Sequence, residues 1–401
     1  MTAKTLVLLT HVVHNAVTQG FIPAAKKLGC RVVVLTDHAM EHQAYYSDHL
    51  ASDLPDEIHD CDVFNSLSVL ELLIRKKIKP DGVFSNSDHL QTQTSQIAHY
   101  FQLPGKDWRV CYQAKNKAAT RERMLEAGLP TIWHASLSTI EELDEATVAF
   151  PCVVKPQEGV ASMHVKLCYQ LEELSDFCQT FWHQHPGQML LLEEYMPGPL
   201  FTLETLGDGE NLFALGGFDT ALSQPPYFIE LECIWNNDKN CAHLQEAFEQ
   251  VKAFGVGFGA CHSEFVLTEQ GPRLVEINYR SIGDGCEFLL DKMAPFNWFE
   301  EILRRYLNEP LTSLAEITGC ALTRFFVAEK SGLLTRQPSD FVENAPCYLK
   351  LENLKTTGTR HQLENSNRDY LAVLSAVGEN RDSLLKTVNE RAESWQWEIQ
   401  A

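Results

Sequence analysis

One short stretch, from Glu264 to Asn278, places strong limits on what this chain can fold into. Its sequence, EFVLTEQGPRLVEIN, has two apolar runs separated by a turn signal around Gly271, which is typical of a β-hairpin. Side chains on a strand alternate between two faces, so Glu276 and Asn278 lie on the same face. If the loop has an odd number of residues centred on Gln270, Glu264 lies directly opposite Glu276.

Two carboxylates that face each other across a hairpin repel and weaken the pairing of the strands. A cation between them removes that penalty, and carboxylate and amide oxygens are the hard ligands that suit Mg2+. We therefore predict that Glu264, Glu276 and Asn278 hold a metal ion. The alternative that this pattern alone leaves open is a solvated polar face on an amphipathic hairpin.

The bulk composition limits the classes of protein that need consideration. A length of 401 residues favours two or three domains, and the net charge of −21 argues against nucleic-acid or anionic-membrane binding. The twelve cysteines form no CxxC pair, which indicates reduced thiols rather than a zinc ribbon. The first residues resemble a β-strand rather than a signal peptide, and no run of apolar residues is long enough to span a membrane. We expect a cytoplasmic protein.

The first 105 residues alternate between apolar strands and helices. Strands are expected at 5–10, 31–36 and 82–85, and helices at 14–28, 69–77 and 91–101. This order predicts a doubly wound parallel sheet with helices on both faces. Such sheets bind ligands at the carboxyl ends of their strands, which makes His11 and Asp88 candidates for substrate contacts. No GxGxxG motif follows the first strand, so a dinucleotide site is not indicated.

Several segments in the middle of the chain carry features of a phosphate site. A charged helix is expected over 115–128, with Lys115 and Lys117 near its beginning. The segment PCVVK is a strand ending in Lys155, and a loop of small residues that includes Ser162 follows it, so backbone N–H groups there can surround phosphates. The loop lacks the Walker motif. Each of these signals is weak by itself, because exposed lysines and surface loops are common.

The rest of the chain adds further strands and helices. The expected strands are 189–195, 201–206 and 320–328, a further apolar segment lies at 371–377, and the expected helices are 245–254, 296–306 and 381–393. Between 213 and 240 the pattern is irregular, with loops around the paired prolines and around 236–238. No internal repeat appears, so a solenoid is not indicated.

The order of these pieces resembles the ATP-grasp superfamily of carboxylate–amine ligases, over roughly residues 1–330. The matching elements are the helix with Lys117 and Arg121 before AGLPT, the PCVVK strand with its loop, the LLLEEYMPGP strand, and the EF…EIN hairpin followed by Arg280. The resemblance implies an N-terminal doubly wound parallel-sheet domain, a central lid domain and a C-terminal antiparallel-sheet domain. The expected boundaries are 1–110, 111–205, 206–320 and a C-terminal extension at 321–401.

The resemblance also implies the roles of individual residues. ATP phosphorylates a carboxylic acid in such enzymes, and an amine then attacks the acyl phosphate, which releases ADP and phosphate. The cofactors are therefore ATP and Mg2+, and the partners are small acid and amine substrates, with a homodimer left open. The residues expected to contact the nucleotide are Lys117, Lys155, Ser162, Glu193, Glu194, Tyr195 and Met196. Those expected to hold Mg2+ are Glu264, Glu276 and Asn278, and those expected to act on the substrates are Arg280 and His262.

Three features depart from the family pattern. Ala161, Met163 and His164 stand where the phosphate loop usually has more glycine. Leu200 occupies the place where relatives often have an acidic ligand for ribose, so Glu204 or another residue is expected to take that role. Before residue 105, nothing matches a known motif for substrate specificity.

The segment ACHSEFVLTEQGPRLVEINYRSIGDG resembles the amino-acid-ligase branch, which makes dipeptides and related amides. Within that branch, a ligase of the vibrioferrin type, from siderophore assembly, is our specific hypothesis. His262 is equally compatible with a structural role and with a substrate role. The alternatives are an ATP-grasp carboxylase of the biotin or purine pathways, and a nucleotide-binding protein without catalysis.

Overall fold

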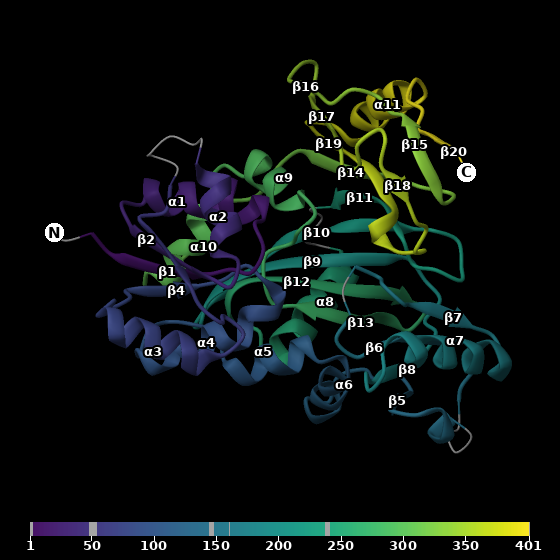
Figure 1. The fold of residues 1–401 in the computed structure, drawn as a ribbon, viewed down its shortest axis with the longest axis horizontal. Coiled ribbons are helices and arrows are strands. Elements are labelled where there is room, and N and C mark those ends of the chain that lie inside the picture. Colours follow the sequence, from purple (N-terminus) through teal and green to yellow (C-terminus); the bar gives the residue numbers. More distant parts are fainter. Residues whose placement is uncertain (1–2, 48–53, 144–147, 160, 237–240, 401) are drawn as a thin grey trace.

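A computed structural model describes the chain from residue 3 to residue 400 with four internal gaps. The described ranges are 3–47, 54–143, 148–159, 161–236 and 241–400. Figure 1 shows the N-terminal elements on one side, a long antiparallel sheet through the middle, and a small lid sheet beside it. Among the described residues, no helix is long and apolar enough to cross a membrane.

The N-terminal domain is the parallel sheet predicted from the sequence. Its strand order is β3 (Glu57–Asp60), β2 (Arg31–Thr36), β1 (Thr5–Leu9) and β4 (Gly82–Phe84), and all neighbours are parallel. Strands β1 and β2 are buried almost throughout because helices cover both faces of the sheet. These helices are α1 (Ile22–Lys27), α2 (Ala39–Tyr46), α3 (Ser66–Lys76) and α4 (Gln91–Tyr100). The sequence analysis missed β3 and α2, whose residues are mostly polar.

The single helix expected over 115–128 is two helices that meet at Asn116. Helix α5 (Trp108–Lys115) ends there and α6 (Lys117–Glu126) begins, with the Asn116 side chain accepting a hydrogen bond from the backbone N–H of Ala119. An asparagine at this position satisfies one of the free N–H groups of the first turn. The break places Lys117 at the start of a helix that runs along the lid.

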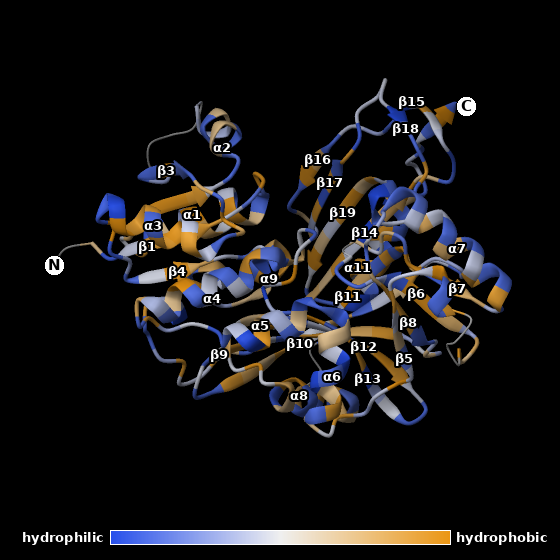
Figure 2. Cartoon of the chain, turned by 60° about the horizontal axis from the view of Figure 1, so that its bottom comes forward, coloured by the Kyte–Doolittle hydropathy of each residue, from blue (hydrophilic) through white to orange (hydrophobic). Residues whose placement is uncertain are grey.

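The lid is a four-stranded antiparallel sheet covered by one helix. Its order is β5 (His134–Leu137), β8 (Leu190–Glu194), β6 (Cys152–Pro156) and β7 (Lys166–Cys168). Helix α7 (Leu171–Gln184) buries Leu174, Cys178 and Phe181, which recur at helical spacing on one face. Figure 2 shows hydrophilic and hydrophobic residues alternating along this helix, as expected for a helix with one face on the core.

A nine-stranded antiparallel sheet holds the hairpin at one edge. Its strands, in order, are β13 (Gly271–Asn278), β12 (Phe258–Thr268), β9 (Leu200–Asp208), β10 (Leu212–Leu222), β11 (Glu230–Asn236), β14 (Cys320–Val327), β19 (Tyr370–Gly378), β17 (Tyr348–Asn353) and β16 (Phe341–Glu343). The expectation of irregular structure was wrong for 213–236, because β10 and β11 lie there as central strands, and 237–240 lie outside the described residues. Glycines at 216 and 217 and the two prolines between the strands weakened the sequence pattern.

The remaining elements pack around this sheet. Helix α8 (Ala242–Phe254) covers one face, and α9 (Cys286–Met293) and α10 (Trp298–Tyr306) lie between the sheet and the N-terminal domain. The last helix is α11 (Arg381–Ala392), and β18 (Arg360–His361), β15 (Gly332–Arg336) and β20 (Glu398–Gln400) form a small third antiparallel sheet.

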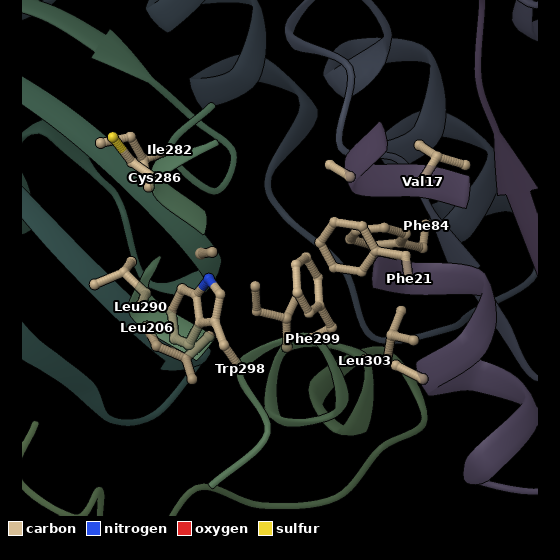
Figure 3. Close-up of a cluster of buried hydrophobic side chains, with 14 of the residues drawn as sticks. Val17, Phe21, Phe84, Leu206, Ile282, Cys286, Leu290, Trp298, Phe299 and Leu303 are labelled. Atoms are coloured by element: carbon tan, nitrogen blue, oxygen red, sulfur yellow. The ribbon is translucent and has the colours of Figure 1, made fainter. Parts of the chain in front are cut away.

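A large apolar cluster joins the N-terminal domain to the long sheet. Phe299 of α10 contacts Phe21 edge to face, with ring centroids 5.0 Å apart, and Trp298 lies close to Leu206 of β9 (Figure 3). The Trp298 indole N–H donates to the Ser281 hydroxyl at 3.0 Å, so this cluster reaches the loop that follows the hairpin. It fixes the position of that loop relative to both domains.

Candidate nucleotide and metal site

The hairpin brings the two predicted acids face to face by a route that the sequence analysis did not foresee. Glu264 pairs directly with Glu276, and Thr268 pairs with Gly271, so the loop between the strands has two residues rather than an odd number. The register shifts beside Glu264, where Val275 is an extra residue in β13. This β-bulge restores the facing position of the acids, as bulges near active sites commonly do.

A buried arginine holds the bulge in place. The Arg121 guanidinium donates to the carbonyl of Leu274 at 2.6 Å and to that of Val275 at 3.2 Å. It also donates through Nε to the Glu193 carboxylate of the lid strand β8 at 2.6 Å. Arg121 is only 1% exposed. A single side chain of α6 therefore connects the lid to the hairpin of Glu264 and Glu276, a role that the sequence analysis did not indicate for Arg121.

The oxygen atoms of Glu264, Glu276 and Asn278 form a donor set that fits a hard divalent cation. The Asn278 side-chain NH2 donates to Glu264 Oε1 at 3.1 Å, which leaves its amide oxygen for other contacts. The Lys117 ammonium lies 2.9 Å from Glu276 Oε1. Carboxylate and amide oxygens are the ligands expected for Mg2+. The Lys117 ammonium thus neutralises Glu276, one of the two facing acids, and reduces the repulsion between them.

The two predicted lysines line one cavity between the lid and the hairpin. Lys117 also donates to the carbonyl of Gly159 in the loop after β6, at 3.0 Å. Burial favours its neutral form, but the neighbouring Glu276 carboxylate prevails and raises the pKa of Lys117. Lys155 lies 2.5 Å from Glu193 Oε2, and burial lowers the pKa of Lys155 in spite of this carboxylate. Both ammonium groups are thus held in fixed positions at the cleft.

Glu193 is the centre of a buried ion network. Burial would raise the pKa of its carboxyl group, but Arg121 and Lys155 together lower this pKa to about 2. The Glu193 carboxylate therefore binds two cationic side chains of the protein at the wall of the cleft. Its neighbour Glu194 is exposed. The backbone N–H groups of Glu194 and Tyr195 donate to the carbonyls of Trp133 and Pro151.

Two adjoining cavities lie between the lid and the long sheet. The first has a volume of about 1050 Å3, and its walls include Val153 of the lid and Val266 and Val275 of the hairpin. The residues predicted to contact the nucleotide all line this first cavity: Lys117, Lys155, Ser162, Glu193, Glu194, Tyr195 and Met196. Glu264 and Glu276 border both cavities, and Ser162 does so as well.

The second cavity is more polar and contains the predicted substrate residues. It has a volume of about 850 Å3 and is lined by His262, Asn278 and Arg280, among others. The Arg280 guanidinium donates to the carbonyl of Ser281 at 3.0 Å. Two acids that the sequence analysis did not single out, Glu230 and Asp284, line the same cavity. Asp284 lies in the IGDG segment, whereas Glu230 lies in the region that looked irregular.

His262 is buried between two carboxylates. Its Nδ1 lies 2.6 Å from Glu204 Oε1, and its Nε2 lies 3.5 Å from Glu264 Oε1. Burial favours the neutral ring, but Glu204 outweighs this effect and raises the pKa of His262 to about 10. The suggestion that Glu204 contacts ribose finds no support, because Glu204 lies beneath His262 and lines neither cavity, whereas Leu200 lines both.

The loop after β6 adopts left-handed backbone conformations, which glycine adopts easily, at residues that carry side chains. Ala161, Ser162 and His164 have φ angles of 55°, 52° and 56°. Residues with a side chain pay a conformational cost there, which their neighbours must offset. The His164 ring packs against His185, with centroids 4.8 Å apart, and not in either cavity. Burial lowers the pKa of His164, so a phosphate contact from this ring is not favoured.

The two edge residues of the N-terminal sheet have protein partners. His11 Nδ1 lies 2.7 Å from Asp37 Oδ1, and His38 lies beside them. Asp88 forms an ion pair with Lys115; burial alone would raise the pKa of Asp88, but the Lys115 ammonium outweighs this effect and lowers it. Neither edge residue lines the two cavities, so the structure does not bring them together with the predicted site.

Comparisons with known proteins identify the domain. Residues 148–288 match the family described as the ATP-grasp domain. The chain is 24% identical to the protein y4rH of Sinorhizobium fredii, with 99% of this chain and 83% of that protein covered. It is 25% identical to carnosine synthase 1 of Gallus gallus, with 67% of this chain covered but only 32% of that much longer protein.

Solved structures share the fold over the full length of the chain. The L-amino acid ligase of Bacillus licheniformis superposes with a TM-score of 0.79, covering 99% of both chains at 18% identity. The biotin carboxylase domain of the Hydrogenobacter thermophilus 2-oxoglutarate carboxylase, solved with MgADP, superposes with a TM-score of 0.68 at 18% identity, covering 100% of this chain and 92% of that one. Residues 148–288 therefore match the ATP-grasp domain, and the whole chain shares its overall fold with these two structures.

Proposed function

We propose that this protein joins a small carboxylic acid to an amine at the expense of ATP, through an acyl phosphate. One observation carries the proposal: two lysines and a facing pair of acids from separate segments surround the same cleft, next to a second polar cavity. Helix α6, the lid with its loop, and the hairpin sheet each contribute side chains to the walls. Relatives named as carnosine synthase and L-amino acid ligase favour an amino acid as one substrate.

In this proposal the first cavity holds ATP. The apolar side chains of Val153, Val266 and Val275 suit the two faces of a base, and the segment from Glu194 to Met196 lies where it can read the edge of adenine. Lys117 and Lys155 contact the phosphates, and Ser162 and the loop around it close over them. Glu193 contributes mainly by holding Lys155. Phosphoryl transfer asks a protein for this kind of positioning and charge compensation.

Glu264, Glu276 and Asn278 would hold Mg2+ beside the phosphates. When bound, Mg2+ supplies positive charge that neutralises the phosphate oxygens. The side chains make their own contribution to the site. Asn278 orients Glu264, and Lys117 exchanges its ion pair with Glu276 for a phosphate contact when the nucleotide arrives.

The reaction itself has two steps. A carboxylate oxygen of the acid attacks the γ-phosphorus of ATP, the bond to the bridging oxygen breaks, and ADP leaves. The amine nitrogen then attacks the acyl carbon, phosphate leaves with the bonding electron pair, and the nitrogen loses a proton. Arg280 lies in the second cavity, where its charge can stabilise the developing acyl phosphate. His262, kept protonated by its two carboxylates, holds Glu264 in position and adds positive charge.

A role in siderophore assembly, a cytoplasmic location and a homodimer remain predictions. Because the fold is also similar to that of a biotin carboxylase domain, an ATP-grasp carboxylase is the alternative function. The amino-acid-ligase assignment predicts that ADP forms only when both an acid and an amine are supplied, and not in response to bicarbonate.

The test is ADP release from the purified chain incubated with ATP, Mg2+, mixtures of free amino acids, and small di- and tricarboxylic acids. We expect ADP release that depends on the substrates, together with an amide product detected by mass spectrometry. The Glu276→Ala variant is the control for contaminating ATPases. Bicarbonate-dependent release would favour a carboxylase, and no release under any condition would leave only a nucleotide-binding protein.

A further inference from the structure

Glu230 stands at the junction of the two cavities. It is the first residue of β11, pairs with Leu222 of β10, and lines both the nucleotide cavity and the second cavity. It is partly exposed to this space, so a ligand can reach its carboxylate. The mechanism above assigns it no role.

The carboxylate of Glu230 has polar partners but no cationic one among the residues that the structure describes. The Asn367 side chain donates to Glu230 Oε1 at 3.3 Å, and the Cys233 thiol lies 3.9 Å from Oε2. Burial and two further acids, Glu264 and Asp284, raise the pKa of Glu230, and His262 opposes them less strongly. An acid in such surroundings is costly unless a cation joins it.

The two cationic side chains of the second cavity, His262 and Arg280, do not serve as partners of Glu230. His262 is bracketed by Glu204 and Glu264. Arg280, with a guanidinium suited to carboxylates and phosphates, faces the same cavity as Glu230. The cavity therefore presents a site for an anionic group together with an acid that lacks a positive partner. An amino acid carries both complementary charges.

We propose that Glu230 binds the protonated amino group of the amino acid whose carboxyl group is phosphorylated. This inference rests on the proposed function and narrows its substrate class to acids with an amino group near the reacting carboxyl group. Asn367 is a positioning residue for Glu230. Its side-chain oxygen accepts from the Glu230 backbone N–H at 3.2 Å, while its side-chain NH2 donates to the carboxylate.

Asn367 also links this site to the phosphate loop. Its backbone N–H donates to the carbonyl of Ala161 at 3.2 Å. Ala161 is one of the loop residues with a left-handed backbone, and it borders both cavities. A residue from the C-terminal part of the chain thus contacts both the proposed amino-group ligand and the loop over the nucleotide. The proposed amino-group site and the loop over the nucleotide therefore share one contact residue.

The test uses hydroxylamine in place of the amine substrate. Hydroxylamine attacks an acyl phosphate to give a hydroxamate and phosphate, and the hydroxamate forms a coloured complex with added Fe(III), so the assay reports only on the acid that is activated. Wild type, Glu230→Gln and Glu232→Gln are each assayed with three sets of substrates. These are the proteinogenic amino acids, β-alanine, and the corresponding acids that lack the amino group. Glu232 is the matched control, because it lies on the same strand, is paired with Arg324 at 2.5 Å and lines neither cavity.

We expect Glu230→Gln to raise KM for the amino acid at least about tenfold, the effect of losing one charge-assisted hydrogen bond. KM for ATP and KM for the acid without an amino group should stay within about twofold of wild type, and Glu232→Gln should resemble wild type. If Glu230→Gln does not fold, Glu230→Asp serves instead, since it keeps the charge and shortens the reach. It should still raise KM for the amino acid alone.

An unchanged KM for the amino acid in Glu230→Gln would overturn the inference. So would an effect that appears only when an amine acceptor replaces hydroxylamine, because Glu230 would then serve the attacking amine. If wild type gives hydroxamate only with acids that lack an amino group, the inference fails while the proposed function stands. If wild type gives hydroxamate with no acid and releases no ADP, the proposed function itself fails.

Discussion

Replacing Glu193 by glutamine should destabilise the protein strongly, because this carboxylate pairs with two buried cations, Arg121 and Lys155. Glu193 lies 2.6 Å from Arg121 Nε and 2.5 Å from Lys155 Nζ, and the three side chains are between 1% and 7% exposed. Glutamine keeps one acceptor oxygen but directs NH2 hydrogens at a cation. Breaking a buried pair in this way costs about 3–5 kcal/mol.

The pKa of Glu193 gives a second, independent magnitude. Its ordinary value of 4.5 falls to about 2 in the folded protein. At roughly 1.36 kcal/mol per unit of pKa, the network stabilises the folded state by about 3 kcal/mol at neutral pH. Because the folded-state pKa is lower than the unfolded one, this stabilisation is complete above pH 4.5 and is lost as the pH falls from there towards 2.

Thermal unfolding of wild type, Glu193→Gln and Glu194→Gln at several pH values checks this prediction. A loss of about 3 kcal/mol lowers Tm by roughly 6 °C or more if the lid and hairpin unfold as one unit. The exposed neighbour Glu194 is the matched control and should change Tm little. The Tm difference should shrink below pH 4.5. A Tm of Glu193→Gln equal to wild type at pH 7, or a difference that grows on acidification, would refute the reasoning.

Three further substitutions test other parts of the site. Glu276→Ala should abolish ATP turnover while circular dichroism shows a retained fold, and turnover like wild type would contradict the metal assignment. Lys155→Ala should weaken nucleotide binding, measured by calorimetry, at least about tenfold through loss of a charged contact; an unaltered Kd would count against its phosphate role. Arg121→Lys should lower the free energy of unfolding by about 1–3 kcal/mol, because lysine cannot reach Glu193 and the two bulge carbonyls of β13 together. Stability equal to wild type would show that the bulge does not need this arginine.

The sequence predicted the elements whose signal is local. The apolar strands of the N-terminal sheet and the alternation around Glu264 and Glu276 follow from periodicity, and the structure confirms both. The facing of the two acids was predicted for the wrong reason, since a bulge at Val275 and a two-residue loop replace the odd loop. A bulge depends on contacts from elsewhere, here from Arg121, so no local pattern reveals it.

The parts that escaped prediction depend on long-range contacts. Glu230 lay in a region whose prolines and glycines hide two central strands, and Asn367 is 137 residues away from it in the chain. Arg121 was named in the sequence only as part of the helix that resembles the family, and nothing indicated its burial, yet it is among the largest fully buried side chains. The buried role of such a charged residue becomes apparent only in the folded structure, where its partners lie beside it.

The central claim is that the cleft beside Glu264 and Glu276 transfers phosphate from ATP to a carboxylate, and oxygen isotopes test it most directly. The acid that supports ADP release is labelled with 18O in both carboxyl oxygens, and the phosphate released during ligation is analysed by mass spectrometry. Attack of the carboxylate on ATP predicts one 18O atom in each phosphate. Phosphate without 18O, formed together with the amide product, would contradict the account.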